Sequence, residues 1–278
     1  MRAIVQRQRA LTRSILSAST NLAYTIHPGT GPHLLLVHGF LSSSRQWLHN
    51  LPALAEVCIP VTVDLYGHGR SPAPETPEYY QPQVYIDALE QIRAEIGAQQ
   101  WFAAGYSLGA GITVRYTHQH PDKVLGHIFT NSSSAFADAA QVEKWQKDAA
   151  ATSERLIQGG LHAVRRIAVH PRFAKRLPAE LYAVLNEDAE RLSPTAVAHT
   201  MAITTPQVNV RDIIASNPRP ALMCYGKLEK RFTPYKVWVE EHMADLQIAD
   251  LQAGHAVNME DSAGFNAAVT QFITQHMP

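Results

Sequence analysis

Three residue types used in nucleophilic catalysis occur in a suitable order along the chain, as Ser107, Glu229 and His255. Ser107 is the centre of Gly-Tyr-Ser-Leu-Gly at residues 105–109, which follows an apolar run and precedes a helix-forming run. In a tight strand-to-helix turn, flanking glycines permit close backbone approach, and the helix N-terminus favours developing negative charge. The pattern predicts a nucleophilic Ser107, and the alternative is a purely structural turn.

The general base is expected to be His255, one of 14 histidines. It follows the last predicted strand, so it would lie at the same sheet edge as Ser107. The order serine, acid, histidine places the acid between them, where Glu229 follows a predicted strand. A carboxylate there would orient the imidazole and stabilise its protonated form. Two alternatives stay open: Glu229 could belong to a solvated charge cluster, or the acid could be the less favoured Asp245 or Asp250.

Acyl chemistry also needs two N–H donors for the oxyanion. His38-Gly39-Phe40 follows an apolar run, and we expect the backbone N–H groups of Phe40 and Leu108 to be these donors. The alternative is a simple strand-to-helix loop. The side chains expected to contact the substrate are His38, Tyr106 and Arg45, although a histidine in the position of His38 more often braces the loop.

An alternating series of strands and helices must position these residues. Short apolar runs bounded by turn residues alternate with amphipathic segments, which is typical of an α/β protein with a mostly parallel sheet flanked by helices. Two helices are predicted at 82–96 and 262–276, the second with Ser262 as its N-cap. The strands are predicted at 22–26, 33–37, 59–63, 101–105, 126–130, 221–225 and 247–251.

The alternation stops between residues 135 and 207, where glycines and prolines interrupt helix-like pieces. We predict an α/β core formed by 1–134 and 208–278, with an inserted helical cap at 135–207. The serine run just before it, 132–134, is expected to be a turn. Aromatic residues of the cap either line an acyl pocket or pack against the core; they are Trp145, Phe173 and Tyr182.

Composition bounds the class of protein. The chain has 278 residues with 24 basic and 24 acidic side chains, so its net charge is 24 − 24 = 0 and nucleic acid is a poor partner. Two distant cysteines exclude a disulfide framework and fit a reducing, cytoplasmic location. No apolar stretch approaches the ~20 residues that span a bilayer. The expected partner is a small-molecule substrate, and the protein is expected to be a monomer or homodimer.

The N-terminus is basic, because four arginines occur before residue 14 and no acidic residue occurs before Glu56. We interpret it as a basic lead-in to the first strand. The alternative is an organelle transit peptide, although a secretory apolar segment is absent.

Five ordered motifs resemble those of the α/β-hydrolase superfamily. They are HGF (38–40), DLYGHGRS (64–71), GYSLG (105–109), GKLEKRF (226–232) and AGHAVNMED (253–261). The resemblance implies an α/β-hydrolase fold with an inserted cap. It also implies that DLYGHGRS is a structural turn at the pocket edge. The family usually carries Asp where this chain has Glu229, a departure that concerns the acid alone.

Within the superfamily, the motifs are similar to those of SHCHC synthase, a cofactor-free enzyme of the menaquinone pathway that eliminates pyruvate from an anionic substrate. That family typically has GYSMGGR, whose arginine grips a substrate carboxylate, whereas the matching position here is Gly111. Because the loss of this cation removes a reason to bind a dianion, the lyase is the second choice. Cations that could act instead, although such residues are more often solvated, are Arg45, Arg115, Arg165, Arg166, Arg172, Lys175 and Arg176.

The expected activity is that of a serine hydrolase, resembling a carboxylesterase, which cleaves an ester, a thioester or a C–C bond beside a ketone in a small to medium substrate. A Ser-His-Glu triad would act through an acyl-enzyme. This chemistry needs no cofactor, and no Cys/His spacing indicates a metal site. A non-catalytic ligand-binding homologue is the third possibility.

Overall fold

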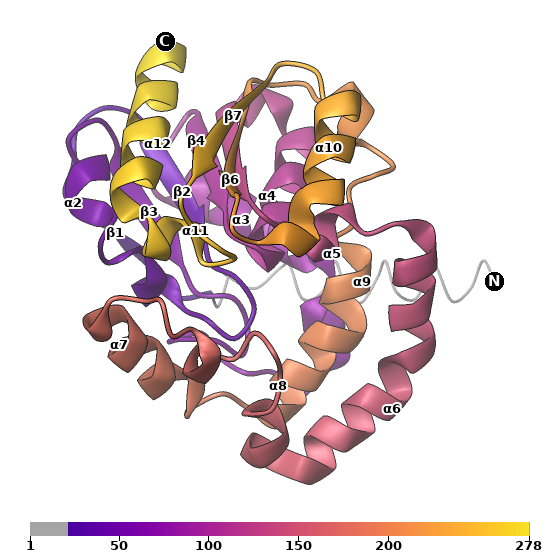
Figure 1. Cartoon of the computed structure of the whole chain (residues 1–278). Helices are drawn as coiled ribbons and strands as arrows, with labels where there is room; N and C mark the ends of the chain where they lie inside the picture. Colours follow the sequence, from indigo (N-terminus) through magenta and orange to yellow (C-terminus); the bar gives the residue numbers. More distant parts are fainter. Residues whose placement is uncertain (1–21, 278) are drawn as a thin grey trace.

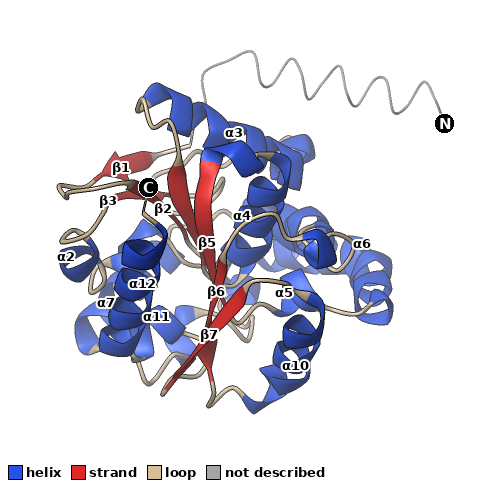
Figure 2. Cartoon of the chain, turned by 90° about the horizontal axis from the view of Figure 1, so that it is seen from above, coloured by secondary structure: helices blue, strands red, loops and turns tan. Residues whose placement is uncertain are grey.

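The computed structural model describes residues 22–277. Seven strands form one sheet in the order β1-β3-β2-β4-β5-β6-β7, as Figures 1 and 2 show. Only the edge strand β1 is antiparallel to its neighbour. All seven predicted strands are therefore present, with small shifts at their ends. They are β1 (Tyr24–Ile26), β2 (His33–Val37), β3 (Ile59–Val63), β4 (Trp101–Gly105), β5 (Val124–Thr130), β6 (Ala221–Gly226) and β7 (Leu246–Leu251).

Helices cover both faces of the sheet (Figure 2). One face carries α2 (Leu51–Leu54), α11 (Val257–Glu260) and α12 (Ser262–His276). The other carries α3 (Pro82–Glu95), α4 (Leu108–Gln119), α5 (Ser133–Phe136) and α10 (Thr233–His242). Short 3₁₀ turns connect several of these elements; they are η1 (Ser44–Trp47), η2 (Pro77–Tyr80), η3 (Pro121–Lys123), η6 (Ile214–Ser216) and η7 (Lys230–Phe232).

Strand β2 shows how the sheet builds two cores. Leu34 and Leu36 point into the cluster beneath α12, whereas Leu35 and Val37 pack with α3 and α4. All four side chains are fully buried. Because successive strand residues point to opposite faces, a continuous apolar run suits a strand covered on both sides. The site residues that follow β2 are therefore anchored to a strand that is buried on both faces.

Two predicted helix starts differ from those observed. The side chain of Asp261, rather than the predicted Ser262, accepts the Gly264 N–H and caps α12, because Ser262 is already the first helical residue. The serine run predicted as a turn instead begins α5, where the Ser132 side chain accepts the Ala135 N–H. Short polar side chains at N-caps stabilise helix starts in this way.

Between α5 and residue 207, the regular elements are all helices, joined by loops. They are α6 (Ala139–Val164), η4 (Pro171–Phe173), α7 (Ala179–Ala189), α8 (Pro194–His199), the π-helix η5 (Thr200–Thr204) and α9 (Thr205–Gln207). Figure 1 shows α6 to α9 gathered together below the sheet. We call the elements from α6 to α9 the inserted helices. They lie within the segment predicted as a cap, residues 135–207, and the division of the chain into core and cap domain stays a prediction.

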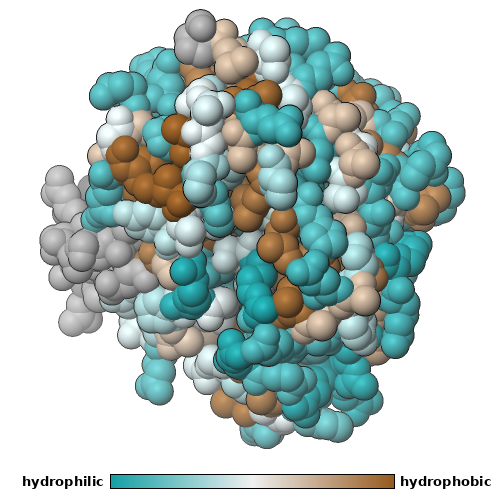
Figure 3. Space-filling model, turned by 90° about the vertical axis from the view of Figure 1, so that its left-hand side faces the viewer, coloured by the Kyte–Doolittle hydropathy of each residue, from teal (hydrophilic) through white to brown (hydrophobic). Residues whose placement is uncertain are grey.

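The surface in Figure 3 is mainly hydrophilic, with small separate groups of hydrophobic residues. None of the helices in residues 22–277 has the length and apolar character required to cross a membrane. The basic lead-in predicted before the first strand falls in residues 1–21, outside the described residues.

Candidate active site

Ser107 lies in a tight turn between β4 and α4. Its backbone has φ 51° and ψ −113°, an unusual conformation for a residue with a side chain. A Cβ on Gly105 would lie 2.3 Å from the Gly109 carbonyl oxygen, and one on Gly109 would lie 2.6 Å from the Val37 carbonyl oxygen. Both glycines are therefore required by close backbone approach, which explains the Gly-x-Ser-x-Gly spacing.

The structure brings the three predicted triad side chains together. Ser107 Oγ lies 2.9 Å from His255 Nε2, and His255 Nδ1 lies 3.1 Å from Glu229 Oε2. With a proton on Nδ1, the imidazole donates to Glu229 and accepts from the serine hydroxyl. The carboxylate at His255 is thus Glu229, not Asp245 or Asp250.

The Glu229 carboxylate has a second donor, which the sequence analysis did not identify. Asn131 Nδ2, directly after β5, donates to Glu229 Oε2 at 2.9 Å. Asn131 is fully buried and also exchanges hydrogen bonds with the backbone of Gly226. Burial tends to raise the pKa of Glu229, but the hydrogen bonds from His255 and Asn131 hold that pKa below its ordinary value. Glu229 is consequently ionised at neutral pH and suited to orient an imidazolium.

Two backbone N–H groups near Ser107 are available to a ligand. Among the described residues, neither the Phe40 N–H nor the Leu108 N–H has a hydrogen-bond acceptor. Leu108 is the first residue of α4, where the N–H has no intrahelical partner and the helix dipole favours negative charge. These are the two predicted oxyanion donors.

His38 does not have the substrate-binding place predicted for it. Its side chain is fully buried, with Nδ1 2.6 Å from the Gly39 carbonyl oxygen and Nε2 accepting the Leu65 N–H. Burial lowers its pKa, so the ring is neutral and its two nitrogens hold the loops after β2 and β3.

A second histidine, His68, supports the same loop. Its Nε2 accepts the N–H of Leu41, whose φ of 57° is unfavourable for a leucine. Burial, together with the neighbouring His38, lowers the pKa of His68 to about 3. The loop that presents Phe40 is thus braced by two neutral histidines, and His68 was missed although it lies in a motif noted in the sequence.

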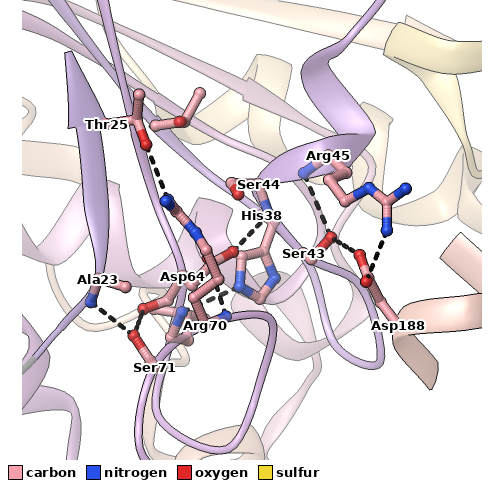
Figure 4. A network of polar contacts seen from close by, with 12 residues as sticks. Ala23, Thr25, His38, Ser43, Ser44, Arg45, Asp64, Arg70, Ser71 and Asp188 are labelled. Atoms are coloured by element: carbon pink, nitrogen blue, oxygen red, sulfur yellow. Dashed lines mark hydrogen bonds and ion pairs between the residues drawn. The ribbon is translucent and has the colours of Figure 1, made fainter. Parts of the chain in front are cut away.

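Arg45 also lies apart from the predicted substrate site. Nη1 of Arg45 pairs with Asp188 at 2.9 Å, at the end of α7 (Figure 4). It also pairs with Glu187 at 3.0 Å. It lines a cavity of about 350 Å³, beside Arg70 and Arg191, whose lining includes no triad residue. Its charge therefore joins η1 to the inserted helices.

Tyr106 lies between His255 and the loop after β2. Its ring centroid is 5.6 Å from that of His255, and a Cβ on Gly39 would meet the ring at 2.6 Å. Burial, with the nearby carboxylates Glu229 and Glu260, raises its pKa, so the hydroxyl stays protonated. Substrate contact by Tyr106 stays a prediction.

Most of the cations considered for an anionic substrate are engaged by neighbours. Arg172 lies over the ring of Phe173, and Lys175 lies over the ring of Tyr182. The remaining contacts are ion pairs: Arg115 with Asp212, Arg165 with Glu190 and Arg176 with Glu260.

Two of the aromatic residues predicted either to line an acyl pocket or to pack against the core are not fully buried. Phe173 is 51% exposed, and Trp145 is half-buried on α6.

The DLYGHGRS segment is a structural turn after β3, as the resemblance implied. Asp64 accepts the N–H groups of Ser44 and Arg70, at 2.7 and 3.1 Å. Ser71 Oγ donates to the Asp64 carbonyl oxygen and accepts the Ala23 N–H (Figure 4). The turn thereby connects β1, β3 and the start of η1.

Comparison with known protein families places the chain in one of them. The sequence profile described as alpha/beta hydrolase fold matches residues 32–262. The chain belongs to the α/β-hydrolase fold family.

Its relatives in that family have different activities. The chain is 26% identical to a pimeloyl-[acyl-carrier protein] methyl ester esterase of Aeromonas hydrophila, over 72% of this chain and 78% of the relative. It is 19% identical to a putative 2-succinyl-6-hydroxy-2,4-cyclohexadiene-1-carboxylate (SHCHC) synthase of Bacillus subtilis, over 89% and 92%. The match to epoxide hydrolase B of Mycobacterium tuberculosis is 32% identical over 35% of this chain, and it covers only 28% of that relative.

A solved structure shows the same fold over nearly the whole chain. MenH from S. aureus superposes with a TM-score of 0.79 at 18% identity, over 93% of this chain and 100% of the other. At this identity, the likeness concerns the fold.

Proposed function

We propose that this protein is a serine hydrolase that cleaves an ester, a thioester or a C–C bond beside a ketone. The observation that carries the proposal is the continuous contact from Ser107 through His255 to Glu229, at 2.9 and 3.1 Å. Two uncommitted N–H groups beside the serine complete the set of groups that acyl transfer requires.

In the proposed reaction, His255 Nε2 takes the proton of Ser107 as Oγ attacks the carbonyl carbon. The N–H groups of Phe40 and Leu108 stabilise the oxyanion, and Glu229 stabilises the imidazolium. Collapse of the tetrahedral intermediate expels the leaving group, which receives the proton from His255. Water then attacks the acyl-enzyme with His255 again as base, and the carboxylic acid leaves.

We further propose that the inserted helices act as a cap over this site and form the acyl pocket. The loop after β2 supports this role, because Phe40 and Leu41 pack in an apolar cluster with α6 and α8. The members of this cluster from the inserted helices include Leu156, Val164, Val197 and Met201. An apolar wall beside the oxyanion donors suits an uncharged acyl group.

A lyase resembling SHCHC synthase is the second candidate, and the nearly full-length similarity to the putative Bacillus subtilis enzyme favours it. The packing of α4 favours the hydrolase. A Cβ on Gly111 would lie 2.5 Å from the Val208 carbonyl oxygen, so the place of the lyase family's arginine is filled by the backbone after α9. Release of pyruvate from the SHCHC precursor would support the lyase instead.

The test is pre-steady-state turnover of p-nitrophenyl esters with acyl chains from acetyl to decanoyl. We expect a burst of p-nitrophenol equal to the enzyme concentration, and the chain-length optimum would report the pocket size. Ser107→Ala should abolish the burst and lower kcat by about 10³-fold or more. Absence of a burst from every ester, or a burst that survives in Ser107→Ala, would contradict the proposal. Ligand-induced stabilisation without turnover would indicate a binding protein.

A further inference from the structure

Helix α7 and the segment just before it, residues 174–178, contact the core at two places, each next to a proposed catalytic loop. Arg176, in that segment, lies against residues 252–256, which we call the histidine loop because they carry His255. The last turn of α7 lies against residues 38–43, which we call the β2 loop because they follow β2 and present Phe40. An element that joins both loops can set their separation.

Just before the start of α7, Arg176 binds Glu260, the last residue of α11. Arg176 Nε lies 2.8 Å from Glu260 Oε2, and its Nη2 donates to Glu260 Oε1 at 3.3 Å, so the guanidinium binds both carboxylate oxygens. Glu260 Oε2 also accepts the N–H of Gly254 at 2.8 Å. The Glu260 side chain is only 9% exposed. The residue beside His255 is therefore bonded to a carboxylate whose position depends on Arg176.

Gly254 is the residue that permits this contact. A Cβ at Gly254 would lie 1.8 Å from Arg176 Nη2 and 3.3 Å from Glu260 Oε2. The guanidinium thus lies directly against the backbone of the histidine loop. Movement of Arg176 and the start of α7 away from the core would break the contact of the guanidinium with both Glu260 oxygens. It would also remove the surface that supports the histidine loop.

At its last turn, α7 binds the β2 loop. Ser43 Oγ donates to Asp188 Oδ2 at 2.6 Å, and Arg45 Nη1 donates to Asp188 Oδ1 at 2.9 Å (Figure 4). Ser43 is 1% exposed and the Asp188 side chain 9% exposed, so these bonds are largely shielded from water. Ser43 is three residues after Phe40, whose N–H is a proposed oxyanion donor.

Helix α7 and the residue just before its N-cap pack firmly on the core. Leu177, which precedes the N-cap, and Leu181 and Leu185 of α7 join the same buried cluster as Trp47 and Met259. These contacts fix α7 across η1 and α11. Small changes at either end can therefore reach the loops instead of being absorbed within the helix.

We propose that α7 positions the two catalytic loops, with Glu260 as a positioning residue for His255 and Asp188 as a positioning residue for the Phe40 donor. This inference rests on the proposed serine-hydrolase function. Neither carboxylate needs to touch the substrate. Each acts through the loop to which it is bonded, so its loss should lower the rate of chemistry rather than the affinity for substrate.

The experiment compares Arg176→Gln, Glu260→Gln and Asp188→Asn with wild type on a short p-nitrophenyl ester. We expect each variant to lower kcat by about tenfold and to change KM by less than about twofold. The double variant of Arg176 and Glu260 should be no slower than the worse single variant, because both act through one contact. Arg176 is 59% exposed, so Arg176→Gln should fold normally.

The matched control is Arg219→Gln. Arg219 forms an ion pair with Asp122, and both residues precede the amino ends of β6 and β5, at the sheet edge opposite the two loops. This variant should keep the wild-type kcat and KM. Phosphorylation of Ser107 by diisopropyl fluorophosphate, with loss of fluoride, supplies a second readout, which should slow in parallel with kcat in the three variants and not in the control.

Unchanged kcat in Arg176→Gln and Asp188→Asn, with a normal wild-type burst, would overturn the α7 proposal alone. A rise in KM at constant kcat would also overturn it, because it would indicate substrate binding rather than loop positioning. Wild-type protein that shows neither a burst nor phosphorylation would overturn the serine-hydrolase function and the α7 role together.

Discussion

At the scale of single residues, the site combines strain with firm support. Ser107 has a backbone conformation that residues with a side chain rarely adopt, and Leu41 in the β2 loop has another. Ser107 is held by the Thr130 hydroxyl, which accepts its N–H, and Leu41 is held by His68. Such strain places the serine hydroxyl at the sheet edge and keeps the donors beside it free.

The strain at Ser107 predicts that glycine stabilises the fold more than alanine does. Both substitutions remove Oγ, but only glycine relieves the backbone strain of a positive φ, which costs roughly 1–3 kcal/mol. Part of this gain is offset, because glycine has greater conformational freedom in the unfolded chain. We expect the free energy of unfolding of Ser107→Gly to exceed that of Ser107→Ala by about 1 kcal/mol. Urea unfolding of the two inactive variants measures the difference. Equal stability, or a less stable glycine variant, would show that the turn is not strained.

At the scale of elements, the turn after β3 joins segments that are distant in the sequence. Asp64 is 1% exposed, and it accepts N–H groups from η1 and from its own turn. Burial alone would raise its pKa, but nearby His38 and the N–H groups of Ser44 and Arg70 hold the pKa of Asp64 below its ordinary value. The ionised carboxylate therefore contributes to stability as well as to the shape of the turn.

Replacing Asp64 with asparagine should destabilise the protein in a pH-dependent way. Since the pKa is lower in the folded state, the charge contributes fully above the ordinary carboxyl pKa of 3.8 and is lost as the pH falls through the folded value. We expect Asp64→Asn to lower the free energy of unfolding by about 1–3 kcal/mol at pH 7. The difference should shrink below pH 3.8. Denaturation measured from pH 7 to pH 3 checks this, and a difference independent of pH would refute the electrostatic cause.

At the scale of the whole molecule, both cysteines report on the integrity of the core. Cys58 and Cys224 are fully buried in the same apolar cluster, beneath the α12 side of the sheet. Burial raises the pKa of the Cys58 thiol to about 12, and it raises the pKa of Cys224 as well. Neither thiol is therefore reactive while the sheet and its helices stay together.

Labelling with Ellman's reagent should thus follow global unfolding. We expect no rapid reaction in the folded protein at pH 8, and both cysteines of the chain should react at once in guanidinium. The labelling rate should rise with urea in proportion to the unfolded population. If Cys58→Ala removed a fast native phase, the β3 side would be opening locally, contrary to this expectation.

Local pattern was enough to predict the strand order along the chain, the tight turn at Ser107 and the three residues of the proposed triad, which the structure brings together. Apolar runs of strand length, and glycines at close approaches, impose these features whatever lies far away in sequence. The interpretation of Glu229 as the carboxylate beside His255 depended only on loops at one sheet edge.

Only the tertiary structure decided which side chains share a contact across long sequence separations. His38 and Arg45 were expected to contact substrate, but burial and pairing with Leu65 and Asp188 give them structural places. Asn131 and Glu260 were not identified, because only the folded chain brings Asn131 to Glu229 and Glu260 to the Gly254 N–H. A sequence determines the conformation of its own segments through local sterics and periodicity, whereas the partner of a buried polar group is chosen by the packing of the whole chain.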